Sequence, residues 1–343
     1  MKYSFANDYS EGCHPSILKA LTDSNLIQQS GYGDDIYTQN ATNVIRQLAH
    51  CPLADVHMVA GGTLANLVVL ASILRPFESV VAATTGHIYT NEAGAIEATG
   101  HKVEAAPTLD GKLRPKDITP FLNKIRGHHM VRTRVVYISN STELGTVYTK
   151  EELTNLYNFC KENDLILFMD GARLPMALTA QSNNLTLADI AALTDAFYLG
   201  GTKCGALLGE AIVIVNPELK KDFKYHLKQR GALSAKGKTI GIQFEQLLQD
   251  NLIFDLARHA NKMAQKISKA FVKLGYTMLI DSDTNQIFPI LPNRLISSLR
   301  EEYEFLTWNI VNADYSAVRL ITSWATPDDI VDEFIKDLEK LSN

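Results

Sequence analysis

Two strand-like runs in the middle of the chain end in residues that could do chemistry. Residues 165–169 form a short, continuous apolar run, as expected of a strand buried on both faces of a parallel sheet, and Asp170 follows it directly. Residues 195–199 repeat the pattern and lead into a glycine-flanked lysine, Lys203. Because open α/β folds bind ligands at the carboxyl edge of the sheet, we expect this carboxylate and this amine to meet in a ligand site.

A carboxylate close to a lysine is the pairing that a pyridoxal 5′-phosphate (PLP) site needs. PLP binds a lysine as a Schiff base, and its ring draws electrons best when the ring nitrogen stays protonated beside a carboxylate. Asp170 would be that carboxylate and Lys203 that lysine. Taken singly, Asp170 could instead cap a helix or turn, and Lys203 could be a solvated loop charge. Their positions at consecutive strand ends, with glycines around the lysine, favour the cofactor site.

A cofactor that carries a phosphate also needs an anion site, and the sequence offers one after the first core strand. Gly61, Gly62 and Thr63 lead directly into an apolar helix, whose first backbone N–H groups and dipole suit an anion. The alternative is a plain helix start with Thr63 as its cap. The segment matches neither a Walker motif nor a dinucleotide-binding Gly-x-Gly-x-x-Gly motif.

Two further polar residues follow strand-like segments at the same predicted edge. His87 comes after the strand that ends at residue 83, where an imidazole could stack on a flat cofactor ring and handle protons, or simply be solvated. Asn140 follows the strand over residues 135–139, where its amide could touch the cofactor or make an Asx-turn.

The chain alternates strands and helices from residue 55, which specifies a mostly parallel sheet with helices on both faces. Strands are expected over residues 56–60, 80–83, 102–105, 135–139, 165–169, 196–199 and 211–215. Helices are expected over residues 63–74, 89–98, 115–125, 150–162 and 187–193. The last strand follows its predecessor after only a glycine-rich loop, which is too short for a parallel crossover, so we expect it to run antiparallel.

With 343 residues, the chain is long enough for more than one domain. We expect an N-terminal arm with helices over residues 1–50, a large α/β domain over residues 51–250, and a small α+β domain over residues 251–343. Long helices are expected over residues 218–229 and 237–274, and short strands over residues 277–280, 286–290 and 317–322. The arm buries little by itself, so it should pack on the large domain or on a neighbouring subunit.

Composition and charge are typical of a soluble globular protein, with 46% hydrophobic and 21% charged residues. The formal net charge of −5 gives no support for a nucleic-acid partner. We find no signal-peptide core and no apolar run long enough to cross a bilayer, so we expect a cytoplasmic protein without a membrane partner. The four cysteines lack Cys-x-x-Cys spacing, which favours reduced thiols over disulfides or a metal site.

In their order along the chain, these motifs resemble the low-specificity threonine aldolases and the related β-eliminating lyases. The resemblance spans nearly the whole chain and rests on residues 61–66 (Gly-Gly-Thr-Leu-Ala-Asn), His87 with residues 92–94 (Glu-Ala-Gly), residues 170–173 (Asp-Gly-Ala-Arg), Lys203, and residues 319–324 (Arg-Leu-Ile-Thr-Ser-Trp). The Asp-Gly-Ala-Arg run followed by the lysine is the most specific of these signals. The resemblance implies a fold-type I, PLP-dependent transferase-like α/β fold: a mostly parallel seven-stranded sheet flanked by helices, plus the small C-terminal domain.

The resemblance also implies a role for each matching residue. Lys203 would form the Schiff base, Asp170 would pair with the ring nitrogen, and His87 would stack on the ring. Gly62 and Thr63 would bind the phosphate.

Other matches concern the substrate and the surroundings of the lysine. Arg173 would lie near the phenolic oxygen of PLP and the substrate, and Arg319 would bind the substrate carboxylate, which suits the fork of donors on a guanidinium. Asn7 and Asp8 match an N-terminal Ser-Asp pair of the family, which places Asn7 at the substrate. Thr202 stands before the lysine where the family usually has serine, and it keeps the hydroxyl.

The chain departs from the family in two places. The family often has a second histidine in a Glu-Asn-Thr-His segment, where this chain offers the Asn-Ser-Thr of residues 140–142, so the identity of the catalytic base stays open. An arginine of the family reaches a neighbour's phosphate site, and here only Arg230, Lys236 and Lys238 lie nearby; Lys236 is our candidate.

We therefore predict a PLP-dependent lyase that cleaves a β-hydroxy-α-amino acid by a retro-aldol reaction, with glycine and acetaldehyde as products from threonine or allo-threonine. β-Elimination from tyrosine-, tryptophan- or serine-type substrates is the alternative. Transamination, or a non-catalytic binding protein of this fold, is less favoured. The family resemblance further implies a homo-oligomer, a dimer of dimers, and we expect no metal.

Overall fold

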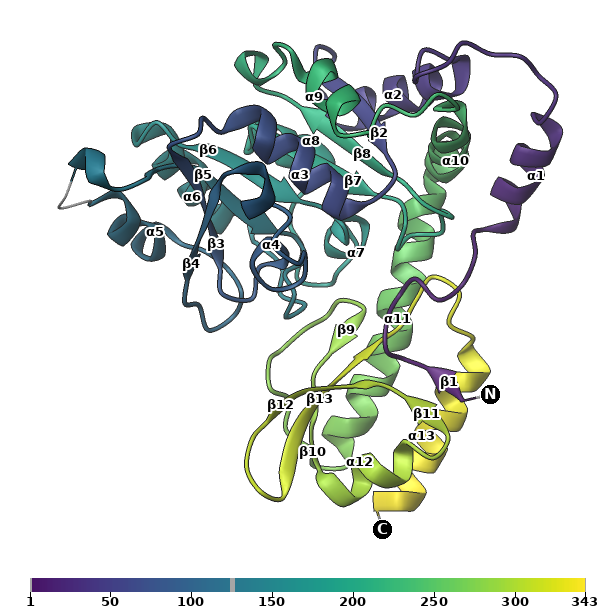
Figure 1. Cartoon of the computed structure of the whole chain (residues 1–343). Helices are drawn as coiled ribbons and strands as arrows, with labels where there is room; N and C mark the ends of the chain where they lie inside the picture. Colours follow the sequence, from purple (N-terminus) through teal and green to yellow (C-terminus); the bar gives the residue numbers. More distant parts are fainter. Residues whose placement is uncertain (1, 124–126, 343) are drawn as a thin grey trace.

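The computed structural model describes residues 2–123 and 127–342. A large sheet with its helices forms the upper part of Figure 1, and a smaller group of strands and helices lies below it. The long helix α11 (Leu252–Lys273) extends from the upper part into the lower one, where both chain ends also lie (Figure 1).

Within the described residues, the large sheet has seven strands in the order β2-β8-β7-β6-β5-β3-β4. Their bounds are β2 (Asp55–Val59), β3 (Glu78–Ala83), β4 (Lys102–Ala106), β5 (Arg132–Ser139), β6 (Ile166–Asp170), β7 (Ala196–Gly200) and β8 (Glu210–Ile214). The pairings among β3 to β7 are parallel, whereas β8 runs antiparallel to both β7 and β2. The prediction of a mostly parallel seven-stranded sheet whose last strand is antiparallel is confirmed.

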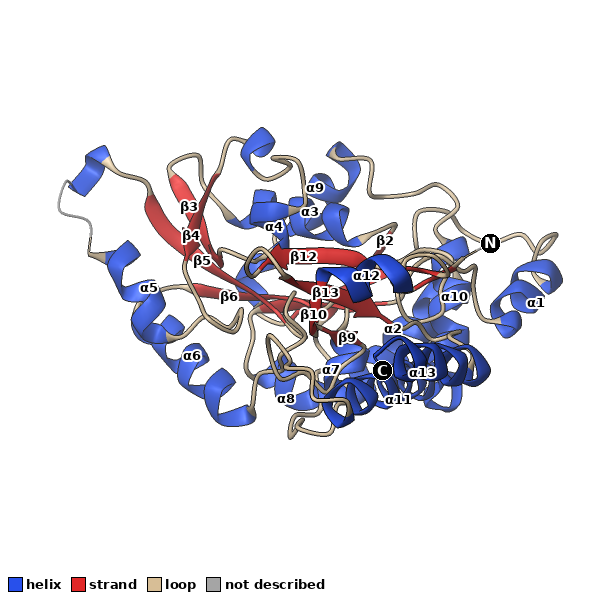
Figure 2. Ribbon diagram, turned by 90° about the horizontal axis from the view of Figure 1, so that it is seen from below, coloured by secondary structure: helices blue, strands red, loops and turns tan. Residues whose placement is uncertain are grey.

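The central strands β6 and β7 are almost entirely apolar, apart from Asp170 at the end of β6, because helices cover both faces of the sheet (Figure 2). Side chains alternate along β6: Leu167 and Met169 pack into one core with α6 and α8, and Ile166 and Phe168 pack into another with α3 and α9. These helices are α3 (Gly62–Ile73), α6 (Lys150–Glu162), α8 (Leu187–Ala192) and α9 (Phe223–Gln229). The alternation turns one continuous apolar run into two buried cores.

The C-terminal strands form a smaller antiparallel sheet. Its order is β10-β13-β12, and β9 also pairs with β13. The elements of this part are β9 (Gln286–Ile287), β10 (Ile290–Pro292), α12 (Asn293–Leu299), β11 (Tyr303–Glu304), β12 (Leu306–Ile310), β13 (Tyr315–Ile321) and α13 (Asp328–Ser342). Apolar side chains of α11, α12 and α13 share one core with β13, as predicted for a small α+β unit.

The N-terminal arm contacts both parts of the molecule. Its first strand, β1 (Tyr3–Ser4), pairs in parallel with β11, so the arm contributes to the small domain. Helices α1 (Pro15–Asp23) and α2 (Ile36–Leu48) pack against α10 (Lys238–Leu248) beside the large sheet. The expected packing of the arm on the large domain is therefore observed. The pairing of β1 with β11 was not expected from the sequence.

The prediction of one helix over residues 89–98 is wrong. The chain instead forms one short helix, α4 (His87–Thr90), and a separate 3₁₀ turn, η1 (Glu97–Thr99). Between them Ala93 and Gly94 have φ values of 51° and 76°, in the left-handed region that an α-helix cannot include.

The prediction of a single helix over residues 237–274 is also wrong. This segment forms two helices, α10 and α11, separated by a 3₁₀ turn, η4 (Gln249–Asn251). Asp250 and Asn251 have φ values of 50° and 61°, and two consecutive left-handed residues interrupt a right-handed helix. The periodic apolar pattern continues across the break, because both helices bury one face.

Smaller differences concern the ends of elements. The helix expected over residues 218–229 begins only at α9, after the 3₁₀ turn η3 (Pro217–Leu219), and residues 277–280 form an isolated bridge from Met278 to Pro289 in place of a strand. The helix expected over residues 115–125 is observed as α5 (Pro115–Leu122), and its predicted end lies outside the described residues. The remaining short helices are η2 (Gly127–His129) and α7 (Leu174–Leu178).

Candidate active site

A cavity of about 310 Å³ lies at the carboxyl ends of β5, β6 and β7, a size typical of small-molecule sites. We call it the strand-end cleft. The predicted site residues in its wall are Gly62, Thr63, His87, Asp170, Arg173, Thr202 and Lys203. The structure therefore brings together residues that are distant in the sequence but follow different strands of one sheet.

Lys203 lies in the glycine-rich turn that follows β7. The turn packs tightly, because a Cβ atom at Gly200 would lie only 2.5 Å from the carbonyl oxygen of Ala172. The Nζ atom of Lys203 forms no hydrogen bond or ion pair with another described residue. Burial lowers the pKa of Lys203, and the nearby Arg173 guanidinium lowers it further. More of the amine is therefore unprotonated, which is the form that attacks a carbonyl carbon.

Asp170 closes β6 and is almost completely buried. Its Oδ2 atom accepts hydrogen bonds from the Tyr137 hydroxyl at 2.6 Å and from Asn66 Nδ2 at 3.0 Å, and its Oδ1 atom accepts one from Ala172 N–H at 3.0 Å. Burial alone would raise the pKa of Asp170, but the charge of His87 and the Tyr137 hydroxyl hold it below its usual value. The wall of the cleft thus carries a fixed negative charge.

The Asp-Gly-Ala-Arg segment turns sharply against β7. A Cβ atom on Gly171 would lie 1.7 Å from the carbonyl oxygen of Tyr198, so glycine alone fits at this position. The following helix, α7, has Arg173 at its N-cap, so Asp170 does not cap it. The Oδ1 atom of Asp170 does support the turn, because it accepts the hydrogen bond from Ala172 N–H. The Oδ2 atom accepts the hydrogen bond from the Tyr137 hydroxyl.

His87 begins α4 and joins a buried polar network. Its Nδ1 atom lies 2.8 Å from Oε1 of Glu92, which also accepts a hydrogen bond from Asn66 Nδ2 at 2.7 Å. Burial would lower the pKa of His87, but the Glu92 hydrogen bond and the charge of Asp170 raise it above its usual value. Asn66 thus links the carboxylates of Glu92 and Asp170. Sequence reasoning missed the roles of Asn66 and Glu92, although both lie in the motif segments.

Arg173 is paired with the N-terminal arm. Its Nε and Nη2 atoms donate to the two oxygens of Asp8 at 2.7 and 3.0 Å, and Asn285 donates to Asp8 at 2.9 Å. Asp8 is fully buried, which would raise its pKa, but Arg173 and Lys203 lower it below its usual value. This pairing fixes the Arg173 guanidinium at the cleft and joins the arm to the large domain.

Asn7, the expected substrate contact, lies beside the cleft and not in its wall. Its Oδ1 atom accepts hydrogen bonds from Tyr9 N–H and from the Ser10 hydroxyl, both at 3.0 Å. This local turn places Tyr9 in the wall of the cleft. The two neighbours of Asn7, Asp8 and Tyr9, therefore make the contacts closest to the site.

The start of α3 is open toward the cleft. Gly61 is the N-cap of this helix, and no side chain caps the helix start. The alternative interpretation, in which Thr63 is the capping residue, is therefore wrong. A Cβ atom on Gly62 would lie 3.0 Å from the Tyr198 hydroxyl, which explains a glycine there. Free N–H groups at this helix start, with the exposed Thr63 nearby, fit a phosphate.

Three other predicted residues lie outside the wall of the cleft. Asn140 is fully buried, and its Oδ1 atom accepts a hydrogen bond from Tyr148 N–H at 3.3 Å. Lys236 is exposed in the loop before α10, away from the cleft of its own chain. Arg319 lies on β13 with its guanidinium 5.3 Å from the ring centre of Trp308, and its buried Nε atom has no hydrogen-bond partner among the described residues.

Thr202 supports the lysine turn. Its hydroxyl oxygen accepts a hydrogen bond from Gly209 N–H at 3.0 Å, which joins the turn to the start of β8. Glu210, the first residue of β8, accepts a hydrogen bond from Gly201 N–H at 3.0 Å and also lines the cleft. Burial raises the pKa of Glu210 to about 7. No motif in the sequence pointed to this carboxyl group.

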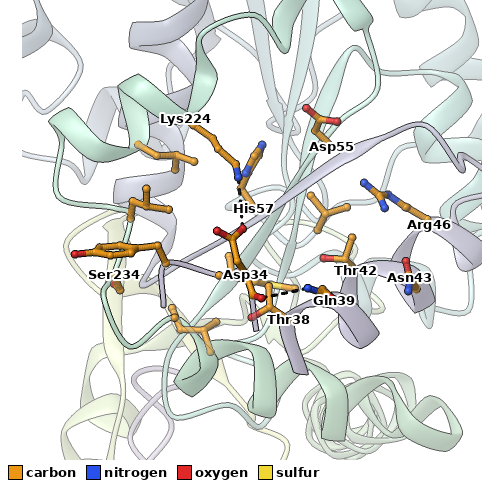
Figure 3. A pocket seen from close by; sticks show the side chains of 18 residues that line it. Asp34, Thr38, Gln39, Thr42, Asn43, Arg46, Asp55, His57, Lys224 and Ser234 are labelled. Atoms are coloured by element: carbon orange, nitrogen blue, oxygen red, sulfur yellow. Dashed lines mark hydrogen bonds and ion pairs between the residues drawn. The ribbon is translucent and has the colours of Figure 1, made fainter. Parts of the chain in front are cut away.

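A second cavity, of about 390 Å³, lies between α2, β2 and α9 (Figure 3). Asp34 and Lys224 form an ion pair across it at 3.6 Å. Burial lowers the pKa of His57, another residue of its wall, to about 4, so this imidazole is neutral at pH 7. The cavity contains none of the predicted site residues, so the strand-end cleft is the candidate active site.

The described residues contain neither a metal-binding cluster nor a membrane-spanning helix. No group of three or more histidine, cysteine, aspartate or glutamate side chains among them is placed to hold a metal ion. None of the helices in this part of the chain is long and apolar enough to cross a membrane. The four cysteines are free.

Comparison with known proteins agrees with this geometry. Residues 15–293 match the family model of the beta-eliminating lyases. The chain is 32% identical to the low specificity L-threonine aldolase of Pseudomonas aeruginosa over 338 residues, which covers 97% of this chain and 96% of that protein.

Solved structures show the same relationship. The threonine aldolase of Leishmania major is 48% identical and superposes with a TM-score of 0.98, over 99% of this chain and 100% of that one. An aspartate aminotransferase of Thermus thermophilus superposes with a TM-score of 0.73 over 99% of this chain and 91% of that one, but it is only 15% identical and shows the fold alone.

The fold and the strand-end cleft define the class: an α/β enzyme of fold type I. Within this class, the chain belongs to the beta-eliminating lyase family, which includes the low-specificity threonine aldolases. The predictions of the family and of a lyase are confirmed.

Proposed function

We propose that the protein is a PLP-dependent aldehyde-lyase that cleaves threonine or allo-threonine to glycine and acetaldehyde. One observation carries this proposal: Lys203, which has no hydrogen-bond partner among the described residues, shares a cleft with the buried, ionised Asp170. The relatives support the choice of substrate, because the Pseudomonas and Leishmania proteins are both threonine aldolases.

The residues of the cleft fit PLP. Asp170 would hold the ring nitrogen, Lys203 the aldehyde carbon and His87 a face of the ring. Gly62 and Thr63 would bind the phosphate at the start of α3. When bound, PLP supplies an electron sink for the pair released from the breaking Cα–Cβ bond.

Other residues would complete the cofactor site. Arg173, held by Asp8, would face the phenolic oxygen, and Thr202 would keep the lysine turn in place. Asn140 would act from beneath the cleft by supporting the loop after β5. Lys236, which is exposed and does not line the cleft of its own chain, would reach the phosphate of a neighbouring subunit, as the family resemblance implies.

Arg319 is the proposed anchor of the substrate carboxylate. Burial lowers its pKa, and the charge of Arg173 lowers it further, so the two guanidinium groups repel each other. A carboxylate placed there would satisfy the unpartnered Nε atom of Arg319 and relieve the repulsion between the cations. Asn7 could contact the substrate through its Nδ2 atom, since its oxygen is used in the local turn.

Product analysis tests the proposed reaction against β-elimination, which needs the same cofactor site. We expect glycine and acetaldehyde from threonine and allo-threonine, measured by chromatography and an aldehyde assay. With serine, tyrosine or tryptophan as substrate, we expect little ammonia to be released. A keto acid and ammonia as the main products would identify a β-eliminating lyase, and a keto acid formed only with an acceptor keto acid would identify an aminotransferase.

We also propose a homo-oligomer, a dimer of dimers, located in the cytoplasm, where free cysteines stay reduced. Large apolar side chains are exposed in the N-terminal segment and on α9, a pattern typical of subunit interfaces. Examples are Leu26, in the loop between α1 and α2, at 90% exposure, and Tyr225 on α9 at 77%. Light scattering should give a mass of at least twice that of the 38.0 kDa chain. An active monomer at assay concentration would contradict the proposal.

A further inference from the structure

Retro-aldol cleavage needs a group that takes a proton from the substrate. The β-hydroxyl must lose its proton as its carbon becomes an aldehyde, and a positioned side chain usually accepts that proton. The sequence leaves this acceptor open, because no histidine occupies residues 140–142, where the resemblance would place one. The structure shows which side chains could replace it.

We propose that Glu143 accepts the proton of the substrate β-hydroxyl; this inference rests on the proposed function. Glu143 lies in the loop after β5, just beyond the segment without histidine, and it lines the strand-end cleft together with Lys203. Its Oε1 atom accepts hydrogen bonds from His87 N–H at 2.9 Å and from the Ser139 hydroxyl at 2.7 Å.

The two oxygens of Glu143 thus have different surroundings. The hydrogen bonds to Oε1 hold the carboxyl group in one position, whereas Oε2 has no hydrogen bond to any other described residue. Glu143 also has no ion-pair partner within the described residues. A carboxylate that is anchored through one oxygen and open at the other can take up a proton without rearrangement of the site.

Three other acidic or basic side chains of the cleft are engaged elsewhere. Nδ1 of His87 is engaged with Oε1 of Glu92 at 2.8 Å. Burial would lower the pKa of His87, but this hydrogen bond raises it above its usual value. Asp170 accepts three hydrogen bonds and is the proposed partner of the ring nitrogen. Glu210 accepts the Gly201 N–H and so belongs to the lysine turn.

Electrostatics support a basic carboxylate at this position. Burial raises the pKa of Glu143, and the charge of Asp170 raises it further, although the Ser139 hydroxyl, the backbone N–H of Glu143 itself and His87 act in the opposite direction. Arg173 and Tyr137 also face this carboxyl group. A carboxylate with a raised pKa is a stronger base than an ordinary one, and proton transfer improves as its pKa approaches the working pH.

The step balances in atoms and electrons. The proton of the β-hydroxyl moves to Oε2 of Glu143, and the electron pair of its O–H bond forms the second C–O bond of acetaldehyde. The Cα–Cβ bond breaks, and its electron pair stays with the Cα side. A proton delivered to Cα completes glycine, so no proton is gained or lost over the whole reaction.

Glu143→Gln tests the assignment, because glutamine keeps an oxygen for both hydrogen bonds but cannot accept the proton. We expect kcat for threonine cleavage to fall by about a hundredfold or more, the usual contribution of a general base. Exchange of the α-proton of glycine with deuterated water, followed by NMR, needs no base at the β-hydroxyl. We expect that exchange rate and the Kd for glycine to stay within about twofold of wild type, a difference of less than 0.5 kcal/mol.

A stability measurement on the protein without cofactor separates this role from a structural one. The pKa of Glu143 is higher in the folded chain than in the unfolded one, so ionisation of Glu143 costs stability as pH rises through that interval. Glutamine removes this cost and keeps the hydrogen bonds. The variant should therefore melt no lower than wild type at neutral pH.

Glu210→Gln is the matched comparison, since Glu210 is the other glutamate that lines the cleft and the substitution removes its charge. Wild-type cleavage by Glu143→Gln would overturn the inference, and so would an equal loss of cleavage and glycine exchange. A selective loss of cleavage in Glu210→Gln alone would assign the proton acceptor to Glu210. Failure of the proposed function is visible separately, because the wild-type protein would then form no glycine from threonine.

Discussion

Replacing Lys203 with alanine is expected to abolish turnover, with a loss of kcat on the order of a thousandfold or more, as is usual for a covalently acting residue. Lys203 is the lysine of the strand-end cleft, and its lowered pKa leaves more of its amine free to react. The variant should also lose the visible absorbance that a lysine-bound PLP gives to the wild-type protein. Borohydride reduction followed by peptide mapping should place the trapped cofactor on Lys203.

Lys224→Ala is a suitable control for this experiment. Lys224 lines the second cavity, where it pairs with Asp34, so its loss should leave the absorbance and the labelled peptide unchanged. A reduced cofactor on a peptide without Lys203 would refute the assignment. A Lys203→Ala variant that still cleaves threonine at the wild-type rate would refute it as well.

The parts of the fold that the sequence predicted are those with strong local signals. The apolar runs of β6 and β7 have no exposed face, and this pattern is typical of central parallel strands. The direction of β8 followed from the length of one loop. By contrast, β12 was missed because most of its side chains are exposed and so give no alternating pattern.

The breaks in the helices could not be seen because they depend on single backbone angles. Ala93 favours helices in general, yet here it adopts a left-handed conformation. Asp250 and Asn251 interrupt a run whose apolar period continues on both sides. Tertiary packing overrides local preference at such positions, and a single sequence carries no sign of it.

The site shows the same division. Asp170 and Lys203 were predictable because strand ends of one sheet must converge. The hydrogen bonds between motifs were not predictable, because they join elements whose relative placement is visible only in the structure. Asn66 reaches both Glu92 and Asp170, and Asp8 holds Arg173 from a distant part of the chain. The sequence marked Asn7 and Asp8 as a pair and placed Asn7 at the substrate, but the contact between Asp8 and Arg173 is visible only in the structure.

Replacing Asp170 with asparagine should slow turnover by at least ten- to a hundredfold. A charge-assisted hydrogen bond to a protonated ring nitrogen contributes about 1.5–3 kcal/mol, and each 1.36 kcal/mol is about tenfold in rate. The true loss should be larger, because without the carboxylate the ring nitrogen loses its proton and draws electrons less well. The assay should use saturating PLP, so that weaker cofactor binding does not enter the rate.

The surroundings of Asp170 predict a separate effect on stability. Its Oδ2 atom accepts from two donors, Tyr137 and Asn66, and an amide nitrogen in that place would face the Asn66 amide donor. A mismatched buried donor costs about 1–3 kcal/mol, so the melting temperature should fall. Asn66→Ala removes one of these hydrogen bonds but keeps the charge of Asp170, and it should therefore lower stability with a much smaller loss of kcat. Wild-type turnover in Asp170→Asn would exclude Asp170 as the partner of the ring nitrogen, whatever its melting temperature, because that role depends on the charge.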